Sequence, residues 1–206
     1  WNAGYDIQKN ETVDDLEFLT SLARYLQKEH GFDPEKTFSA GMSNGGDMSY
    51  LLGCQAPNIF KAIAPITGCM MGWIYDSCDQ NQPLPVFQVH GTADNTTYYD
   101  GDENNRDQWG AYMGVEKTID LWVKRNQCKS VVIDTLPDQD PKDGSIVISH
   151  KYIDGLNGNQ VWFYKIINGD HEWPPGWPER SGNGDLYTST EIWKFFSQDM
   201  KNRGVL

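Results

Sequence analysis

The stretch Lys36-Thr37-Phe38-Ser39-Ala40-Gly41-Met42-Ser43-Asn44-Gly45-Gly46 decides the fold of this chain. Residues 36–40 have the pattern of a short strand and residues 44–55 that of a helix, so Gly-x-Ser-x-Gly lies between them. A nucleophile elbow requires this setting, with small residues on both sides of a serine held out at the end of a sheet. The helix start also favours negative charge that develops beside Ser43. We therefore predict that Ser43 is a catalytic nucleophile.

Strand and helix patterns alternate outward from this turn. The helical spacing of apolar residues predicts a helix with Thr12 as its N-cap and Gly31 as its stop. The predicted helices are 12–30, 44–55, 114–126 and 188–201, and the predicted strands are 36–40, 60–67, 86–90, 146–153 and 161–167. Because the strand patterns are apolar on both faces, we expect a mainly parallel sheet with helices on both faces. Together with the elbow, this predicts an α/β fold of the α/β-hydrolase type.

A serine nucleophile needs a base, and His171 is the best candidate of four histidines. In this fold the order along the chain is serine, acid, histidine, and the histidine follows the last strand. His171 fits that order. His90 ends an earlier strand and could lie near the site, whereas His30 is expected to be solvated and His150 structural.

The acid is expected between Ser43 and His171, directly after a strand. The run His90-Gly91-Thr92-Ala93-Asp94 ends a strand and presents Asp94 at the carboxyl edge of the sheet. Asp100 and Asp102 are the competitors, and we interpret them as solvated loop residues.

The composition excludes several other classes of protein. The 206 residues suit one domain, and 8 Trp, 10 Tyr and 8 Phe can supply a large core. No apolar run is long enough to span a membrane. A net charge of −12 makes binding to nucleic acid or to an anionic lipid surface improbable.

The cysteines and acidic loops do not indicate a metal site. None of Cys54, Cys69, Cys78 and Cys128 forms a Cys-x-x-Cys pair, which argues against zinc. Cys69 and Cys78 flank a short loop and could form a disulfide, with buried free thiols as the alternative. The Asp-rich loops 98–110 and 134–144 do not match the EF-hand pattern. The predicted chemistry needs no metal and no organic cofactor.

Three motifs in this order resemble the polyhydroxybutyrate-depolymerase-like esterases, which are related to the feruloyl and acetylxylan esterases of carbohydrate esterase family one. They are Gly41-Met42-Ser43-Asn44-Gly45-Gly46, His90-Gly91-Thr92-Ala93-Asp94 and Gly169-Asp170-His171-Glu172-Trp173-Pro174. The resemblance extends over essentially the whole chain. It implies a secreted or periplasmic ester hydrolase with Ser43 as nucleophile, Asp94 as acid and His171 as base.

The front of the chain departs from this family. One oxyanion donor is expected from the backbone N–H of Asn44, and the fold takes the other from a loop after an earlier strand. The 42 residues before Ser43 are used by one helix and one strand, so no segment remains for that loop. We therefore expect residues 1–206 to form the C-terminal part of a longer catalytic domain, whose missing N-terminal segment is a partner. A reduced enzyme with a substitute donor is the alternative.

The sequence predicts the reaction type but leaves several substrate classes open. Trp109, Trp173 and Trp177 lie on or beside predicted loops and could stack on a sugar or a phenolic acyl group, or could only pack against loop backbone. Feruloyl or acetyl esters of plant polysaccharides are the first choice, and hydroxyalkanoate polyesters the second. A serine peptidase of the same fold and a non-catalytic carbohydrate-binding relative remain alternatives.

Overall fold

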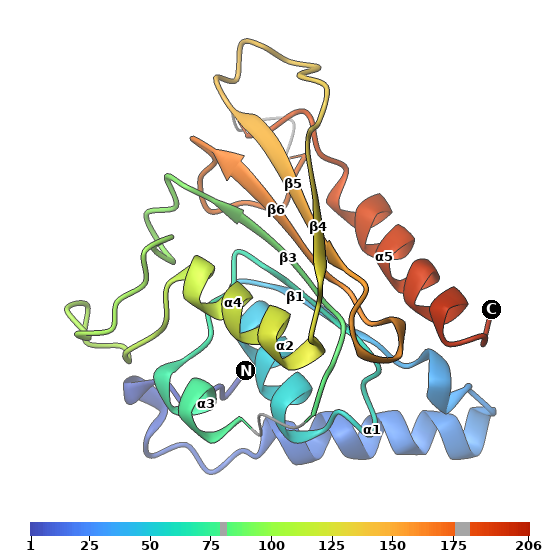
Figure 1. The fold of residues 1–206 in the computed structure, drawn as a ribbon. Coiled ribbons are helices and arrows are strands. Elements are labelled where there is room, and N and C mark those ends of the chain that lie inside the picture. Colours follow the sequence, from blue (N-terminus) through green and yellow to red (C-terminus); the bar gives the residue numbers. More distant parts are fainter. Residues whose placement is uncertain (79–81, 176–181) are drawn as a thin grey trace.

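A six-stranded sheet forms the centre of the molecule. The computed structural model describes residues 1–78, 82–175 and 182–206. The strand order is β1-β2-β3-β6-β5-β4 (Figure 1). The strands β1, β2, β3 and β6 are mutually parallel, whereas β5 is antiparallel to both of its neighbours, β6 and β4. Their bounds are β1 Ser39–Met42, β2 Ile63–Ile66, β3 Val86–Gly91, β4 Ser130–Thr135, β5 Ile146–Ile153 and β6 Val161–Ile167.

Helices cover both faces of this sheet, as the sequence predicts. The helices α2, α3 and α4 pack on one face and α5 on the other (Figure 1). Short 3₁₀ segments lie at Asp6–Gln8, Pro34–Lys36 and Leu156–Gly158. The helix bounds are α1 Asp15–His30, α2 Asn44–Gln55, α3 Gly72–Ser77, α4 Val115–Asn126 and α5 Thr188–Asn202.

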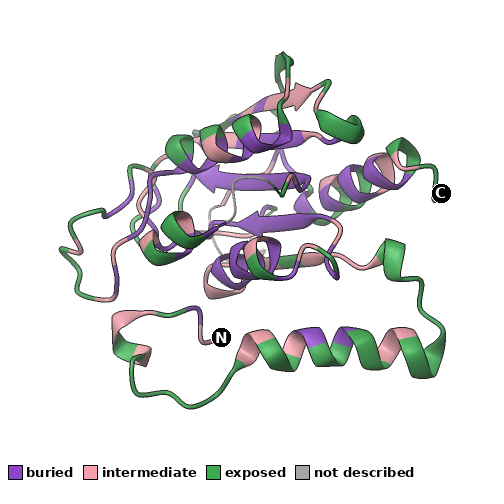
Figure 2. Ribbon diagram, turned by 60° about the horizontal axis from the view of Figure 1, so that its bottom comes forward, coloured by how far each residue is buried: buried purple, intermediate pink, exposed green. Residues whose placement is uncertain are grey.

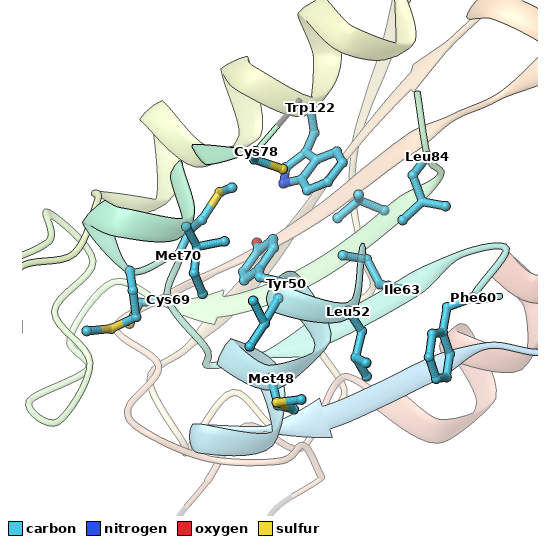
Figure 3. Close-up of a cluster of buried hydrophobic side chains, with 14 of the residues drawn as sticks. Met48, Tyr50, Leu52, Phe60, Ile63, Cys69, Met70, Cys78, Leu84 and Trp122 are labelled. Carbon is cyan, nitrogen blue, oxygen red and sulfur yellow. The ribbon is translucent and has the colours of Figure 1, made fainter. Parts of the chain in front are cut away.

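Two apolar clusters fill the space between the sheet and its helices. In the first, Tyr50 of α2 and Trp122 of α4 pack as stacked rings above the sheet (Figure 3). In the second, Phe87 and Trp162 pack against Phe195 of α5. All residues of β2 and β3 are buried, which confirms the prediction of strands that are apolar on both faces. Burial of this surface at about 25 cal/mol per Å² is the main force that holds the layers together.

The structure corrects several details of the predicted elements. The first strand is Ser39–Met42 and not 36–40, and the short helix α3 was not predicted. The first helix begins at Asp15, and Asp14 rather than Thr12 caps it by accepting a hydrogen bond from Glu17 N at 2.8 Å. Gly31 ends that helix with a φ of 67°, as predicted. The strand β4 was not predicted, because all six of its residues are exposed and its apolar run Val131-Val132-Ile133 does not alternate. It forms only because it can pair with β5.

The disulfide joins Cys54 to Cys78, so the pairing of Cys69 with Cys78 that the sequence suggested is wrong. Cys54 lies near the end of α2 and Cys78 directly follows α3, and these helices pack together. Cys69 is instead a buried free thiol of the first apolar cluster. Cys69 and Cys78 are close in sequence, but the packing of α2 against α3 decides which cysteine pairs with Cys78.

One edge of the sheet is open. In the part of the chain that the structure describes, β1 pairs with β2 alone. The helix α1, which contacts α2, is largely exposed, as the green and pink segments of its ribbon in Figure 2 show. Its side chains Phe18, Leu22 and Tyr25 are 53%, 40% and 56% exposed. None of the helices in the described ranges is long and apolar enough to cross a bilayer.

Candidate active site

The parallel strands bring three distant residues to one edge of the sheet. Ser43 follows β1 and begins α2, Asp94 follows β3, and His171 follows β6. Because β1, β2, β3 and β6 run parallel and lie side by side, their carboxyl ends share this edge. Ligands of open α/β sheets bind at this edge.

The backbone at Ser43 has the strain of a nucleophile elbow. Its φ of 54° and ψ of −124° are rare for a residue with a side chain. A Cβ on Gly41 would lie 2.5 Å from the carbonyl of Gly45, so the turn requires glycine there. A Cβ on Gly45 would meet no atom closer than 4.0 Å, so a side chain at position 45 would cause no clash. The turn leaves the first N–H groups of α2, beginning with Asn44, without intrahelical partners.

His171 and Asp94 form a hydrogen-bonded pair at this edge. His171 Nδ1 lies 2.9 Å from Asp94 Oδ2, and the carboxylate oxygen can only accept. Asp94 Oδ1 accepts from the backbone N–H groups of Thr96 at 2.8 Å and Thr97 at 2.7 Å. Burial alone would raise the pKa of Asp94, but hydrogen bonds from His171 and His90 outweigh it and hold that pKa well below its usual range. Asp94 is therefore an ionised acceptor, which suits it to orient an imidazole.

Close contact between two loops brings this pair together. A Cβ on Gly91 would lie 2.2 Å from the carbonyl oxygen of Gly169, so the loops after β3 and β6 touch through backbone. Ala93 N donates to Gly169 O at 2.9 Å, and Asn168 N donates to Thr92 Oγ1 at 2.9 Å. The glycine of the His90-Gly91-Thr92-Ala93-Asp94 motif thus permits the contact between the acid and the base.

Ser43 Oγ makes no hydrogen bond within the described residues, so the nucleophile and His171 are not joined in this state. Such bonds often tighten only when substrate binds.

The competing candidates lie elsewhere or have other partners. Asp102 is 2% exposed and binds Arg106 Nε at 3.0 Å, so it is neither solvated, as the sequence suggested, nor paired with a histidine. His30 is exposed, and His150 lies on β5 with its ring near Phe163. His90 does touch Asp94, at 3.3 Å from Nε2 to Oδ2, yet it is completely buried.

A pocket of about 240 Å³ opens at Ser43. Its aromatic walls are Tyr5 and Trp109, whose rings meet edge to face at 5.3 Å. Its other lining residues are Ile7, Ser43, Asn44, Asp47, Thr96 and Thr97. Pockets for drug-sized ligands measure roughly 300–1,000 Å³, so this one suits a single acyl group rather than a polymer chain.

Of the three tryptophans predicted to contact substrate, Trp109 lines this pocket. Trp173 packs against the second apolar cluster, and its Nε1 lies 3.3 Å from Ser189 Oγ. Trp177 lies outside the described residues. Tyr5 and Ile7 were missed by sequence reasoning, because nothing local indicates that a segment 36 residues or more before Ser43 folds onto it.

A buried carboxylate, that of Asp47, lines the pocket. Asp47 of α2 accepts a hydrogen bond from the Tyr5 hydroxyl, and its Oδ1 accepts from Cys69 N at 2.6 Å. Asn44 Nδ2 donates to the same Tyr5 oxygen at 3.1 Å. Burial raises the pKa of Asp47 to about 6, although these hydrogen bonds act against the rise. Asp47 and Asn44 thus hold the Tyr5 ring as a fixed wall of the pocket.

We expect Asp47 to make the protein less stable as the pH rises from about 4 to about 6. In this window the native state holds a proton that the unfolded chain has already released, so the free energy of unfolding falls with pH. The loss is at most about 3 kcal/mol, at 1.36 kcal/mol for each unit of pKa difference. Urea unfolding of wild type and Asp47→Asn at several pH values measures it. The stability difference between them should shift across this window, whereas the exposed Asp120→Asn control should follow wild type. Parallel curves for wild type and Asp47→Asn would contradict the assignment.

Comparison with known proteins gives the family. A model of the prolyl oligopeptidase family matches residues 2–134, and the chain belongs to that family. Its fold is that of an α/β-hydrolase, as the sequence predicts. Acetyl xylan esterase from Aspergillus awamori has a similar fold, with a TM-score of 0.55 and 13% sequence identity over 89% of this chain and 67% of that one.

Proteins with similar sequences support the predicted resemblance to feruloyl and acetylxylan esterases. Feruloyl esterase B of Piromyces equi is 30% identical over 120 residues, which cover 56% of this chain and 22% of that protein. Feruloyl esterase D of Neurospora crassa is 24% identical over 197 residues, which cover 96% of this chain and 59% of that protein. A bifunctional acetylxylan esterase/xylanase of Neocallimastix patriciarum is 29% identical over 51% of this chain and 15% of that protein. The chain thus spans less than two thirds of the length of each of these relatives.

Proposed function

We propose that this protein is a carboxylic ester hydrolase in which Ser43, His171 and Asp94 act as a catalytic triad. The observation that carries this proposal is a strained serine elbow at the same sheet edge as a hydrogen-bonded histidine–aspartate pair. Relatives named as feruloyl and acetylxylan esterases support ester chemistry. No metal or organic cofactor takes part in the proposed reaction.

The reaction proceeds through an acyl-enzyme. Ser43 Oγ attacks the ester carbonyl carbon, and its proton passes to His171 Nε2. The Asn44 backbone N–H, at the positive end of α2, stabilises the oxyanion. When the C–O bond to the alcohol breaks, the proton on Nε2 passes to the departing oxygen. Water then attacks the acyl-enzyme with the same proton transfers, while Asp94 holds the imidazole and stabilises its cation.

Feruloyl or acetyl esters of plant polysaccharides are the substrates that we propose, with hydroxyalkanoate esters as a second choice. The pocket at Ser43 has two aromatic walls, which suit a flat phenolic acyl group, and its size leaves the carbohydrate chain outside. The Cys54–Cys78 disulfide supports a secreted or periplasmic location, because disulfides persist in oxidising compartments.

Replacing Trp109 by alanine tests the choice of acyl group. We expect kcat/KM for methyl ferulate to fall about 10-fold, which corresponds to roughly 1.4 kcal/mol of lost ring contact. The value for p-nitrophenyl acetate should change much less, because an acetyl group is too small to need the aromatic wall. Trp193→Ala removes a tryptophan that is 62% exposed on α5 and serves as the control. Equal losses on both esters would contradict a phenolic acyl site.

The family name favours one second candidate, a serine peptidase of the same fold. Both reactions use the same triad, so the leaving group separates them. Assaying methyl ferulate beside the corresponding amide decides between them: hydrolysis of the ester alone supports the esterase, and hydrolysis of the amide at a comparable rate supports the peptidase.

We further propose that strands from outside residues 1–206 complete this domain along the open edge of β1 and supply the second oxyanion donor. The amides of Ser39 and Ser43 bond to β2, so by alternation those of Ala40 and Met42 face the open edge. In the 206-residue chain alone, we expect these two amides to exchange hydrogen much faster than that of Gly41. Equal protection of all three would contradict an open edge.

A further inference from the structure

A buried chain of hydrogen bonds continues beyond the triad acid into the sheet. Gln88 Oε1 accepts from the Tyr50 hydroxyl, and Gln88 Nε2 lies 3.2 Å from Gly68 O and 3.3 Å from His90 Nδ1. On the other side of its ring, His90 Nε2 lies 2.8 Å from Thr97 O and 3.3 Å from Asp94 Oδ2. Gln88 is 1% exposed and His90 is completely buried. The ring therefore contacts the triad acid from inside the protein.

Two backbone carbonyls fix the direction of these bonds. A carbonyl oxygen can only accept, so the bond to Thr97 O requires a proton on His90 Nε2. The bond to Gly68 O likewise requires the NH₂ group of Gln88 on the side of His90, where it donates to Nδ1. An Nδ1 that accepts carries no proton, so His90 is the neutral Nε2–H tautomer.

The result is that four polar groups contact Asp94, and the single Nε2–H of His90 is shared between Thr97 O and Asp94 Oδ2. The backbone N–H groups of Thr96 and Thr97 bind Oδ1, and the rings of His90 and His171 both lie against Oδ2. Rotation of the carboxylate would break all of these contacts at once. Oδ2 is therefore held at the position from which it accepts the Nδ1 proton of His171.

We propose that His90 is a positioning residue of the triad: held as a neutral donor by Gln88, it fixes Asp94 Oδ2 toward His171 and takes up no proton during turnover. This inference rests on the proposed function. His90 acts through Asp94, because both of its ring nitrogens are occupied and its ring has no exposed surface.

The charged and titratable groups around His90 agree with this role. Asp94 is its nearest carboxylate, Asp47 of α2 is a second carboxylate in its surroundings, and the Tyr99 ring packs edge to face at 6.1 Å. At Nδ1, however, the partner is the uncharged amide of Gln88 and not a carboxylate, so no acceptor is offered to a proton on that nitrogen.

A matched pair of amide variants tests the proposal. His90→Gln places an amide N–H near the position of Nε2, whereas His90→Asn reaches only the position of Nδ1 and offers Asp94 no donor. Both are neutral and remove the ring. We expect His90→Asn to lower kcat for p-nitrophenyl acetate about 100-fold with KM unchanged, as a misplacement near 1 Å would. His90→Gln should recover most of that loss at a similar melting temperature.

Two further readouts separate positioning from a structural role. The proton between His171 and Asp94 should give a low-field NMR signal that is kept in His90→Gln and lost in His90→Asn. This signal needs no turnover, so it tests the positioning even if the esterase proposal fails. The acid limb of kcat/KM should have the same number of ionisations in wild type and His90→Gln. If the His90 variants do not fold, Gln88→Met, which removes the donor to Nδ1 together with the bonds to Tyr50 and Gly68, should weaken the same signal.

Three results would overturn the proposal. Equal loss of kcat in both His90 variants would mean that the ring itself is required. Full activity in His90→Asn would mean that Asp94 needs no such support. Loss of one ionisation in His90→Gln would mean that His90 titrates.

Discussion

Replacement of Ser43 by alanine is expected to lower kcat for p-nitrophenyl acetate by about 10⁶-fold, to the rate of the uncatalysed reaction plus residual binding effects. The acyl-enzyme forms through Ser43 Oγ, and no other group at the start of α2 can replace that bond. Steady-state hydrolysis measures the loss, and the burst of p-nitrophenol should vanish with it. Unfolding in urea should show that the variant is folded.

Ser49→Ala is the matched control for this experiment. Ser49 is also a serine of α2, but it is buried and bonds Ser39 Oγ and Gly45 O, both at 2.9 Å. Its loss should cost about 1 kcal/mol of stability and leave kcat within a small factor of wild type. Activity of Ser43→Ala close to that of Ser49→Ala would rule out Ser43 as the nucleophile.

If the wild-type chain folds but hydrolyses no ester, the second oxyanion donor is expected to come from strands that pair with the open edge of β1. Loss of one oxyanion donor typically costs about 10²–10³ in turnover. A donor carried by strands outside residues 1–206 would then be restored by adding those strands. If the added strands pair with β1 and turnover is still absent, the esterase proposal itself fails.

Asp94→Asn is expected to lower kcat by about 10⁴-fold while KM stays nearly constant. An amide NH₂ group at the position of Oδ2 cannot accept the Nδ1 proton of His171, so the imidazole is left with its acceptor nitrogen turned away from Ser43. The loss should therefore fall on the chemical step. Kinetics on p-nitrophenyl acetate near neutral pH measure both parameters.

Asp102→Asn provides the comparison for Asp94→Asn. Asp102 is equally buried, but it holds Arg106 and the Asp107 N–H at 3.1 Å rather than a histidine. This variant should lose stability with little change in kcat. A larger loss of kcat in Asp102→Asn than in Asp94→Asn would contradict the assignment of Asp94 as the triad acid.

Local patterns in the sequence were sufficient for the architecture and for the order of the candidate triad. Glycines around Ser43, buried strands that are apolar on both faces, and amphipathic helices each leave a signal within a few residues. The structure accordingly has α2 at the predicted residues 44–55 and α4 within one residue of the prediction. The contact between His171 and Asp94 follows from the same logic, because adjacent parallel strands end at one edge.

Contacts between segments far apart in the chain were decided only by the tertiary structure. The strand β4 exists through pairing with β5, Cys54 bonds Cys78 because α2 and α3 pack together, and Tyr5 reaches Asp47 across the start of α2. The role proposed for His90 belongs to the same class, since its motif shows a histidine at a strand end but not the carbonyls that fix its proton. Secondary structure depends largely on near neighbours, whereas a disulfide, a pocket wall or a tautomer depends on which distant groups the packed layers bring within hydrogen-bonding distance.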